Sequence, residues 1–103
     1  MATETGYEHV VLDLDGTPMI AGTSMKVKEL IAERYAWGWS PEELLVNHPQ
    51  LTLGQIFSAL AYYADHQAEL DQALEADLQF TDRMRRQGSP SPLTVRLRDA
   101  RRR

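Results

Sequence analysis

The apolar and polar positions near the N-terminus follow the pattern of short β-strands. The run VVLDL, residues 10–14, holds four β-prone apolar side chains, and residues 16–18, Gly-Thr-Pro, supply turn chemistry directly after it. Met19 and Ile20 continue the apolar pattern until a second break at Gly22. This part of the sequence therefore predicts a small β-hairpin or a pair of extended arms.

From Met25 to Gly38 the apolar residues change to the three- and four-residue spacing of an α-helix. Gly38 is suited to the left-handed conformation that ends a helix, so the sequence predicts a first helix of about three turns. Its apolar face consists of Val27, Leu30, Ile31 and Tyr35, together with Ala36 or Trp37.

Two capping boxes predict the starts of the next two helices. Residues 40–43, Ser-Pro-Glu-Glu, combine a serine N-cap, a proline at the first helical position and a glutamate three residues after the cap. That helix must end by His48, because Pro49 excludes helical geometry from the residue before it. Residues 52–55, Thr-Leu-Gly-Gln, repeat the capping pattern. The apolar stripe expected on the third helix is Leu53, Ile56, Phe57, Leu60 and Ala64.

The third helix is expected to be unusually long, since no helix breaker follows Ala64 until Gly88. A helix from Thr52 to Gln87 would measure roughly 50 Å, more than a domain of this size needs to cover its own core. Its distal half carries apolar residues about 3.5 positions apart with acidic neighbours, which favours pairing with a second copy. The expected seam of this homodimer is Tyr63, Leu70, Leu74 and Leu78.

These patterns predict a mainly α fold, in which three helices contain a helix-turn-helix, with a short N-terminal β-hairpin or arms and a long C-terminal helix. The expected divisions are a disordered N-terminus at 1–6, a helix-turn-helix domain with β arms at 7–64, a helix extension for dimerisation at 65–87, and a basic flexible tail at 88–103.

The charge is distributed unevenly along the 103 residues. Residues 1–82 hold three basic side chains against fourteen acidic ones, a net charge of −11, whereas residues 83–103 hold eight arginines against Asp99 alone, a net charge of +7. Such a basic tail is typical of a segment that contacts an anionic surface on nucleic acid, on another protein or on the chain's own body.

Composition narrows the classes of protein further. The chain has no cysteine, which excludes disulfides, thiolate metal sites and a cysteine nucleophile. No apolar run approaches the roughly 20 residues that cross a bilayer, and the N-terminus lacks the features of an export signal, so we expect no membrane contact and a cytoplasmic protein. His9, His48 and His66 are too far apart in sequence to predict a metal site, and no cofactor is expected.

Residues 13–17, Asp-Leu-Asp-Gly-Thr, resemble the nucleophile loop of haloacid dehalogenase phosphatases, in which two aspartates and a magnesium ion carry the chemistry. That chemistry needs a parallel sheet with further catalytic residues at later strand ends, and the pattern after Gly22 is helical. A hairpin turn is therefore the favoured interpretation, with a magnesium-dependent phosphatase built on Asp13 and Asp15 as a remote alternative.

A larger resemblance covers about Tyr7 to Ala64. The spacing of Asp13, Pro18, Ile20, Gly22 and Thr23, followed by GWSPEE at 38–43 and by HPQLT at 48–52, is similar to the bacterial family called domain of unknown function 433. Thr17 and Ser24 stand where that family usually has lysine and arginine. The resemblance implies a homeodomain-like helix-turn-helix in an antitoxin, commonly paired with a nuclease-like toxin of PIN type.

Two non-enzymatic functions remain open from the sequence. As an operator-binding protein, the chain is expected to use the outward side chains of the third helix and two lysines of the first: Thr52, Gln55, Ser58, Tyr62, Lys26 and Lys28. The absence of any lysine or arginine between residues 35 and 82 opposes this, because phosphate neutralisation supplies most of the affinity for DNA.

The alternative is a protein-interaction module, structural or antitoxin-like, with no role at DNA. In that case the basic tail would bind an acidic partner, such as the carboxylate cluster of a PIN-type nuclease. The arginines expected to make this contact are Arg96, Arg98, Arg101, Arg102 and Arg103.

Overall fold

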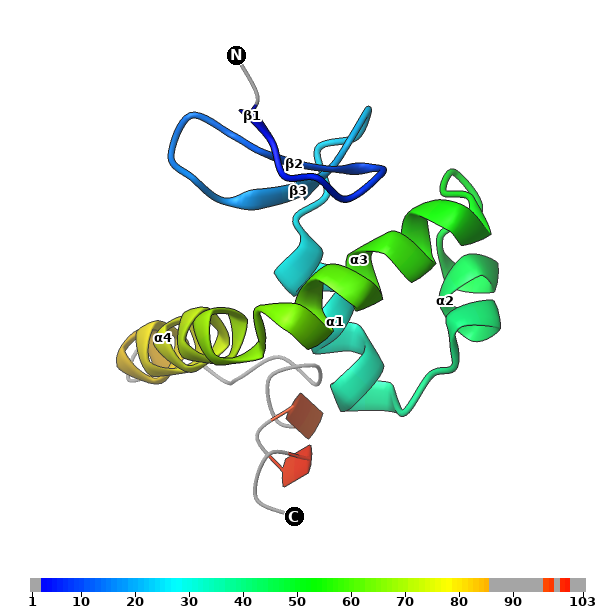
Figure 1. The fold of residues 1–103 in the computed structure, drawn as a ribbon. Coiled ribbons are helices and arrows are strands. Elements are labelled where there is room, and N and C mark those ends of the chain that lie inside the picture. Colours follow the sequence, from blue (N-terminus) through cyan, green and yellow to red (C-terminus); the bar gives the residue numbers. More distant parts are fainter. Residues whose placement is uncertain (1–2, 86–95, 98, 101–103) are drawn as a thin grey trace.

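The computed structural model describes residues 3–85, 96–97 and 99–100, with Arg85 described by its backbone alone. Within these residues the protein is mainly helical, with one small sheet at its N-terminal end (Figure 1). The elements are β1 Thr3–Glu4, β2 Val10–Leu12, β3 Pro18–Ile20, α1 Val27–Trp37, α2 Pro41–Asn47, α3 Leu53–Asp65 and α4 Gln67–Arg85.

The sheet is antiparallel in the order β1-β2-β3, so the predicted hairpin between residues 10 and 20 is confirmed. We expected residues 1–6 to be disordered, but Thr3 pairs with Leu12 and Glu4 with Val11 in a third strand. The Thr5 hydroxyl donates a 2.8 Å hydrogen bond to the Val10 carbonyl and closes the connection between the strands. Such a side-chain contact over five residues carries no signature in the apolar pattern.

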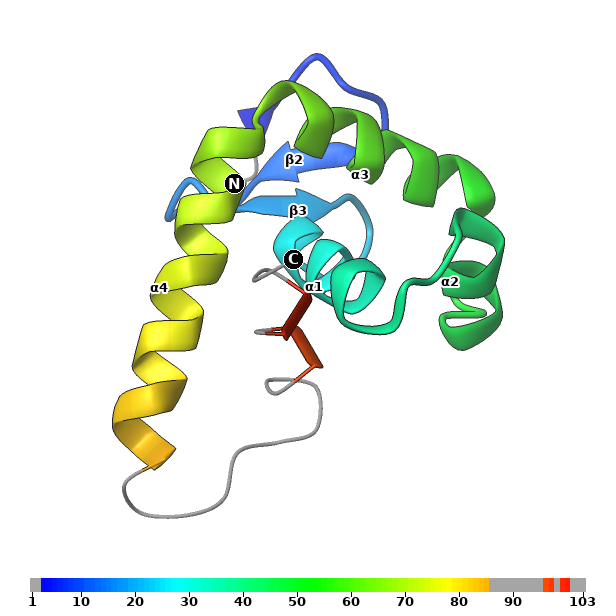
Figure 2. The same cartoon turned by 90° about the horizontal axis from the view of Figure 1, so that it is seen from below.

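Helix α1 forms the centre of the core, as Figure 2 shows by its position between α4 and α2. Its inner face consists of Val27, Leu30 and Ile31, which are fully buried, and of Ala36, whereas Tyr35, predicted on the same face, is 40% exposed. The helix ends at Gly38, which adopts the expected left-handed conformation with φ of 70°. Gly38 also donates its backbone N–H to the Arg34 carbonyl, which satisfies one of the free carbonyls of the last turn.

Helices α2 and α3 begin at the two predicted capping boxes. Ser40 accepts a hydrogen bond from the Glu43 backbone N–H, and the Glu43 side chain accepts one from the Ser40 backbone. Helix α2 ends before His48, whose ring Nε2 lies 3.0 Å from both carboxylate oxygens of Glu33 on α1. This contact fixes the turn between α2 and α3 against the core.

The prediction of one helix from Thr52 to Gln87 is wrong. The chain breaks at His66, which has φ of −125° and ψ of 32°, and α4 leaves at a steep angle to α3 (Figure 2). The His66 backbone N–H donates to the carbonyls of Tyr62 and Tyr63, and its ring stacks on Tyr62 with centroids 4.0 Å apart. Neither glycine nor proline lies at this break, so the sequence pattern gave no signal that the helix ends there.

Because of this break, the apolar stripe of α4 packs against the core of its own chain. Leu70, Leu74 and Leu78 are 3%, 2% and 6% exposed, and the first two belong to the same buried cluster as Leu30 and Ile31 of α1. These leucines were predicted to form the seam of a homodimer. The structure instead uses them within one chain, so the length of the third helix no longer gives a reason for a second copy.

Candidate functional site

The outer face of α3 is the surface on which the sequence placed its functional residues. The helix packs against α1, α2 and β2, so its buried side is wider than a single stripe and is centred on Ile56, Ala59 and Tyr62. The sequence had put Phe57 inside and Tyr62 outside, and both assignments are wrong. Phe57 is 48% exposed, whereas Tyr62 is 5% exposed.

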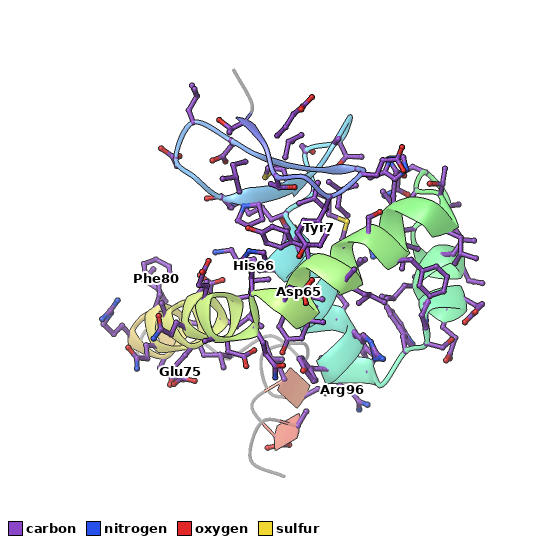
Figure 3. The ribbon with its side chains drawn as sticks, viewed as in Figure 1. Tyr7, Asp65, His66, Glu75, Phe80 and Arg96 are labelled. Atoms are coloured by element: carbon purple, nitrogen blue, oxygen red, sulfur yellow. The ribbon has the colours of Figure 1, made fainter. Side chains whose placement is uncertain are left out.

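Tyr62 belongs to an aromatic cluster beneath the sheet rather than to a groove-reading face. Its ring stacks on His66 and makes an edge contact with Tyr7 at 5.2 Å between centroids. The Tyr7 hydroxyl in turn donates to the Asp65 carboxylate, and Figure 3 shows Tyr7, Asp65 and His66 gathered at the end of α3. Burial, with a smaller effect of Glu69, raises the pKa of Tyr62 above its ordinary value.

Two of the other predicted DNA contacts are engaged in capping α3. The Thr52 side chain accepts from the Gln55 backbone N–H, and the Gln55 side chain accepts from the Thr52 backbone at 2.7 Å. Gln55 also donates through Nε2 to the Ala21 carbonyl at 3.3 Å. Both side chains therefore stabilise the start of the helix. Of the α3 residues predicted to contact DNA, half-buried Ser58 has neither a capping role nor an aromatic contact among the described contacts.

The two lysines do not join these residues. Lys26 is the N-cap of α1, at the start of the helix and directly after the sheet. Lys28 forms an ion pair with Asp77 of α4, with Nζ and Oδ2 3.1 Å apart. The structure thus engages Lys28 in holding α4 against α1 and does not assemble the six predicted DNA contacts into one surface.

The predicted dimer residue Tyr63 takes part in a polar network inside the chain. Its hydroxyl lies 2.6 Å from the hydroxyl of Tyr35 on α1 and donates to the Asp71 carboxylate of α4 at 2.8 Å. Burial raises the pKa of Tyr63 well above its ordinary value, and the two hydrogen bonds raise it further. The network ties three helices together at the point where α4 departs.

Arg96, predicted to bind a partner, lies beside the chain's own α1 (Figure 3). Its Nε donates to the Ala36 carbonyl at 3.0 Å, and its guanidinium lies 4.4 Å from the centroid of the Trp37 ring. Leu97 is 6% exposed and packs with Ala36 and Leu78. A cation at the carbonyl end of a helix is favourable. The other predicted arginines, Arg98, Arg101, Arg102 and Arg103, lie outside the described residues.

The Asp-Leu-Asp-Gly-Thr segment forms the turn between β2 and β3. Asp13 Oδ1 accepts hydrogen bonds from the backbone N–H groups of Asp15 and Thr17, both at 2.9 Å. Gly16 supplies the left-handed residue with φ of 80°. The hairpin interpretation therefore accounts for the motif by turn chemistry. Within the described ranges, no group of three or more metal-ligating side chains comes together.

An exposed apolar surface is what the sequence reasoning missed. The exposed positions of α3 are Gly54, Phe57, Ala61, Ala64 and Asp65. The first four are uncharged and, apart from Phe57, small, whereas the Asp65 carboxylate at the C-terminal end accepts a hydrogen bond from Tyr7. On α2, Val46 is 78% exposed. The acidic side chains Glu42 and Glu43 lie at the start of the same helix. Gly54, Phe57, Ala61 and Ala64 are three, four and three residues apart, and this helical spacing was the sequence signal that could have identified the face.

The fold and these surfaces define a small, mainly helical domain whose N-terminal sheet and bent α3–α4 pair enclose α1. Residues 14–63 match the model of a family described as "Protein of unknown function (DUF433)", and this match supports the family that the sequence resemblance predicted. No curated protein and no solved structure matches the chain. Among the helices described, none is both long and apolar enough to span a membrane.

Proposed function

We propose that this protein acts without catalysis, by binding a partner protein through the outer face of α3. The observation that carries the proposal is Phe57, an aromatic side chain held 48% exposed on a helix face whose charged residue, Asp65, lies at the C-terminal end. Aromatic residues are enriched at the centres of protein interfaces, where charged residues are depleted. The surface around Phe57 has that composition, since its outward neighbours are glycine and alanine.

The same face is poorly suited to DNA. A helix that enters the major groove gains most of its affinity from lysine and arginine contacts with phosphates. The sequence from 35 to 82 contains neither residue type, and α2 adds two carboxylates, Glu42 and Glu43, in its first turn. These carboxylates would repel phosphates that approach α2.

The family resemblance stated from the sequence implies what kind of protein such a partner would be. An antitoxin-like protein binds a toxin, commonly a PIN-type nuclease, and neutralises it by contact. The apolar face of α3 would then be the docking surface. Insertion of the terminal arginines into the carboxylate cluster of the nuclease stays a prediction for Arg98 and Arg101 to Arg103, because Arg96 is engaged on α1.

Co-purification tests this function. Tagged wild-type protein, co-expressed with the product of the adjacent gene in its genome, is expected to retain that product on the affinity column. Phe57→Asp places a charge at the centre of the proposed interface and is expected to abolish retention. Phe80→Asp, a matched change at an exposed phenylalanine of α4, is expected to leave it intact. Equal retention by both variants would contradict the proposal.

Operator binding is the second candidate, favoured by the arrangement of two short helices joined by a turn, α2 and α3. A gel-shift titration with the DNA upstream of its own gene separates the two functions. A steep fall of affinity with salt would support phosphate contacts, and weak binding independent of sequence would leave protein binding as the function.

A further inference from the structure

A second apolar stripe runs along α4 on a side that the core does not use. Phe80 is 56% exposed and Met84 is 51% exposed, although both lie on the helix that buries three leucines. With Glu69, Ala73 and Ala76 they recur at spacings of four and three residues, which places all five on one face. Figure 3 shows Phe80 projecting from a different side of α4 than Glu75.

The N-terminal part of this face borders a cavity. The space between the β2–β3 turn and α4 measures about 290 Å³. Its lining includes Leu12, Thr17 and Pro18 on the sheet side, Glu69 and Ala73 on α4, Lys28 on α1 and Tyr62 on α3. A protein cavity of roughly 150 Å³ is known to hold benzene, so this space is large enough for one phenyl ring. This face of α4 therefore carries the projecting ring of Phe80 and, seven residues before it, the cavity beside Ala73, called the hollow below.

We propose that a second copy of this chain docks antiparallel along α4, with Phe80 of each copy in the cavity of the other. The ring and the hollow lie seven residues apart, roughly 10 Å along the helix, so a two-fold axis between residues 76 and 77 brings each ring to the hollow opposite. One patch that fits itself in this way closes into a dimer rather than an open chain.

The residues between and beside the two anchors suit this arrangement. Ala76 lies next to the axis, where a small side chain allows the helices to approach closely. Arg83 of one copy comes beside Glu69 of the other. An antiparallel partner thus pairs these opposite charges at both ends of the contact, whereas a parallel partner aligns like charges.

This dimer differs from the one that the sequence predicted, which used the leucines now buried within the chain. It is also independent of the proposed function, because Phe57 and α3 take no part in it. A result that removes the α4 dimer therefore leaves the partner-binding surface of α3 untouched.

Sedimentation equilibrium on the full chain tests the proposal. Wild-type protein is expected to reach twice its 11.7 kDa mass within a concentration range extending to about 0.1 mM. Removing both rings in Phe80→Ala is expected to weaken dimerisation by at least about a hundredfold. Ala73→Leu, which fills the hollow, is expected to do the same, and Phe57→Ala is the control that leaves the dimer unchanged. Circular dichroism verifies that each variant is folded.

Disulfide crosslinking gives a second measurement that does not depend on affinity. Because the chain has no cysteine, Ala76→Cys introduces a single thiol next to the proposed axis and is expected to crosslink two copies readily. Glu75→Cys on another side of α4 is expected to crosslink slowly. A wild-type monomer throughout the concentration range, or a dimer that resists both Phe80→Ala and Ala73→Leu, would overturn the proposal.

Discussion

Replacing Leu74 by alanine should destabilise the protein strongly if α4 belongs to the core of its own chain. Leu74 is 2% exposed within the cluster that contains Leu30 and Ile31 of α1. Removing its buried methyl and methylene groups costs about 2.4 kcal/mol in transfer free energy, and the cavity left behind adds to this. We expect a loss of about 3 kcal/mol in the free energy of unfolding, out of a total of roughly 5–15 kcal/mol.

The assay is urea unfolding followed by far-ultraviolet circular dichroism, carried out in a Phe80→Ala background so that dimerisation does not contribute. Leu14→Ala is the matched control, because Leu14 is 85% exposed in the β2–β3 turn and its truncation should cost less than about 0.5 kcal/mol. In thermal unfolding the same loss at Leu74 corresponds to a fall in Tm of roughly 12–24 °C. Equal stability of the two leucine variants would refute the packing of α4 on α1.

Three further predictions concern local contacts. Thr52→Ala removes the N-cap of α3 and should lower the free energy of unfolding by about 1 kcal/mol in a urea titration, an effect that Thr52→Ser should largely reverse. Because the pKa of Tyr63 is raised in the folded protein, its neutral hydroxyl contributes stability that is fully present below the ordinary tyrosine pKa of 10.0 and is lost as the pH rises further. The free energy of unfolding of Tyr63→Phe should therefore fall less than that of wild type in unfolding titrations above pH 10.0. Arg96→Ala removes the cation from the Trp37 ring and should change tryptophan fluorescence while costing only about 0.5–1 kcal/mol; an unchanged spectrum would contradict that contact.

The sequence predicted those elements whose boundaries are set by nearby residues. The capping boxes at Ser40 and Thr52 and the left-handed Gly38 each depend on side chains or backbone within a few residues, so their signals are readable in the chain itself. The hairpin turn at Asp13 was predicted for the same reason, because its hydrogen bonds reach only Asp15 and Thr17.

Contacts between distant segments account for the errors. An apolar stripe at helical spacing shows that a face is buried, without showing whether the covering surface belongs to the same chain or to a second one, which is why Leu74 was assigned to a dimer seam. The turn at His66 depends on an aromatic stack with Tyr62, which in turn contacts Tyr7. The sheet covers a second side of α3, and this wider coverage buried Tyr62 and left Phe57 outside.

Both proposals rest on one claim, that a single chain buries the inner faces of α3 and α4 and leaves Phe57 and Phe80 outside. Isotope-filtered NMR on a sample mixed from labelled and unlabelled chains tests it most directly, because nuclear Overhauser effects within a chain are separated from those between chains. We predict that the methyl groups of Leu70 and Leu74 contact the methyl groups of α1 within the same chain. Contacts of these leucines with α1 that appear only between chains would contradict the account.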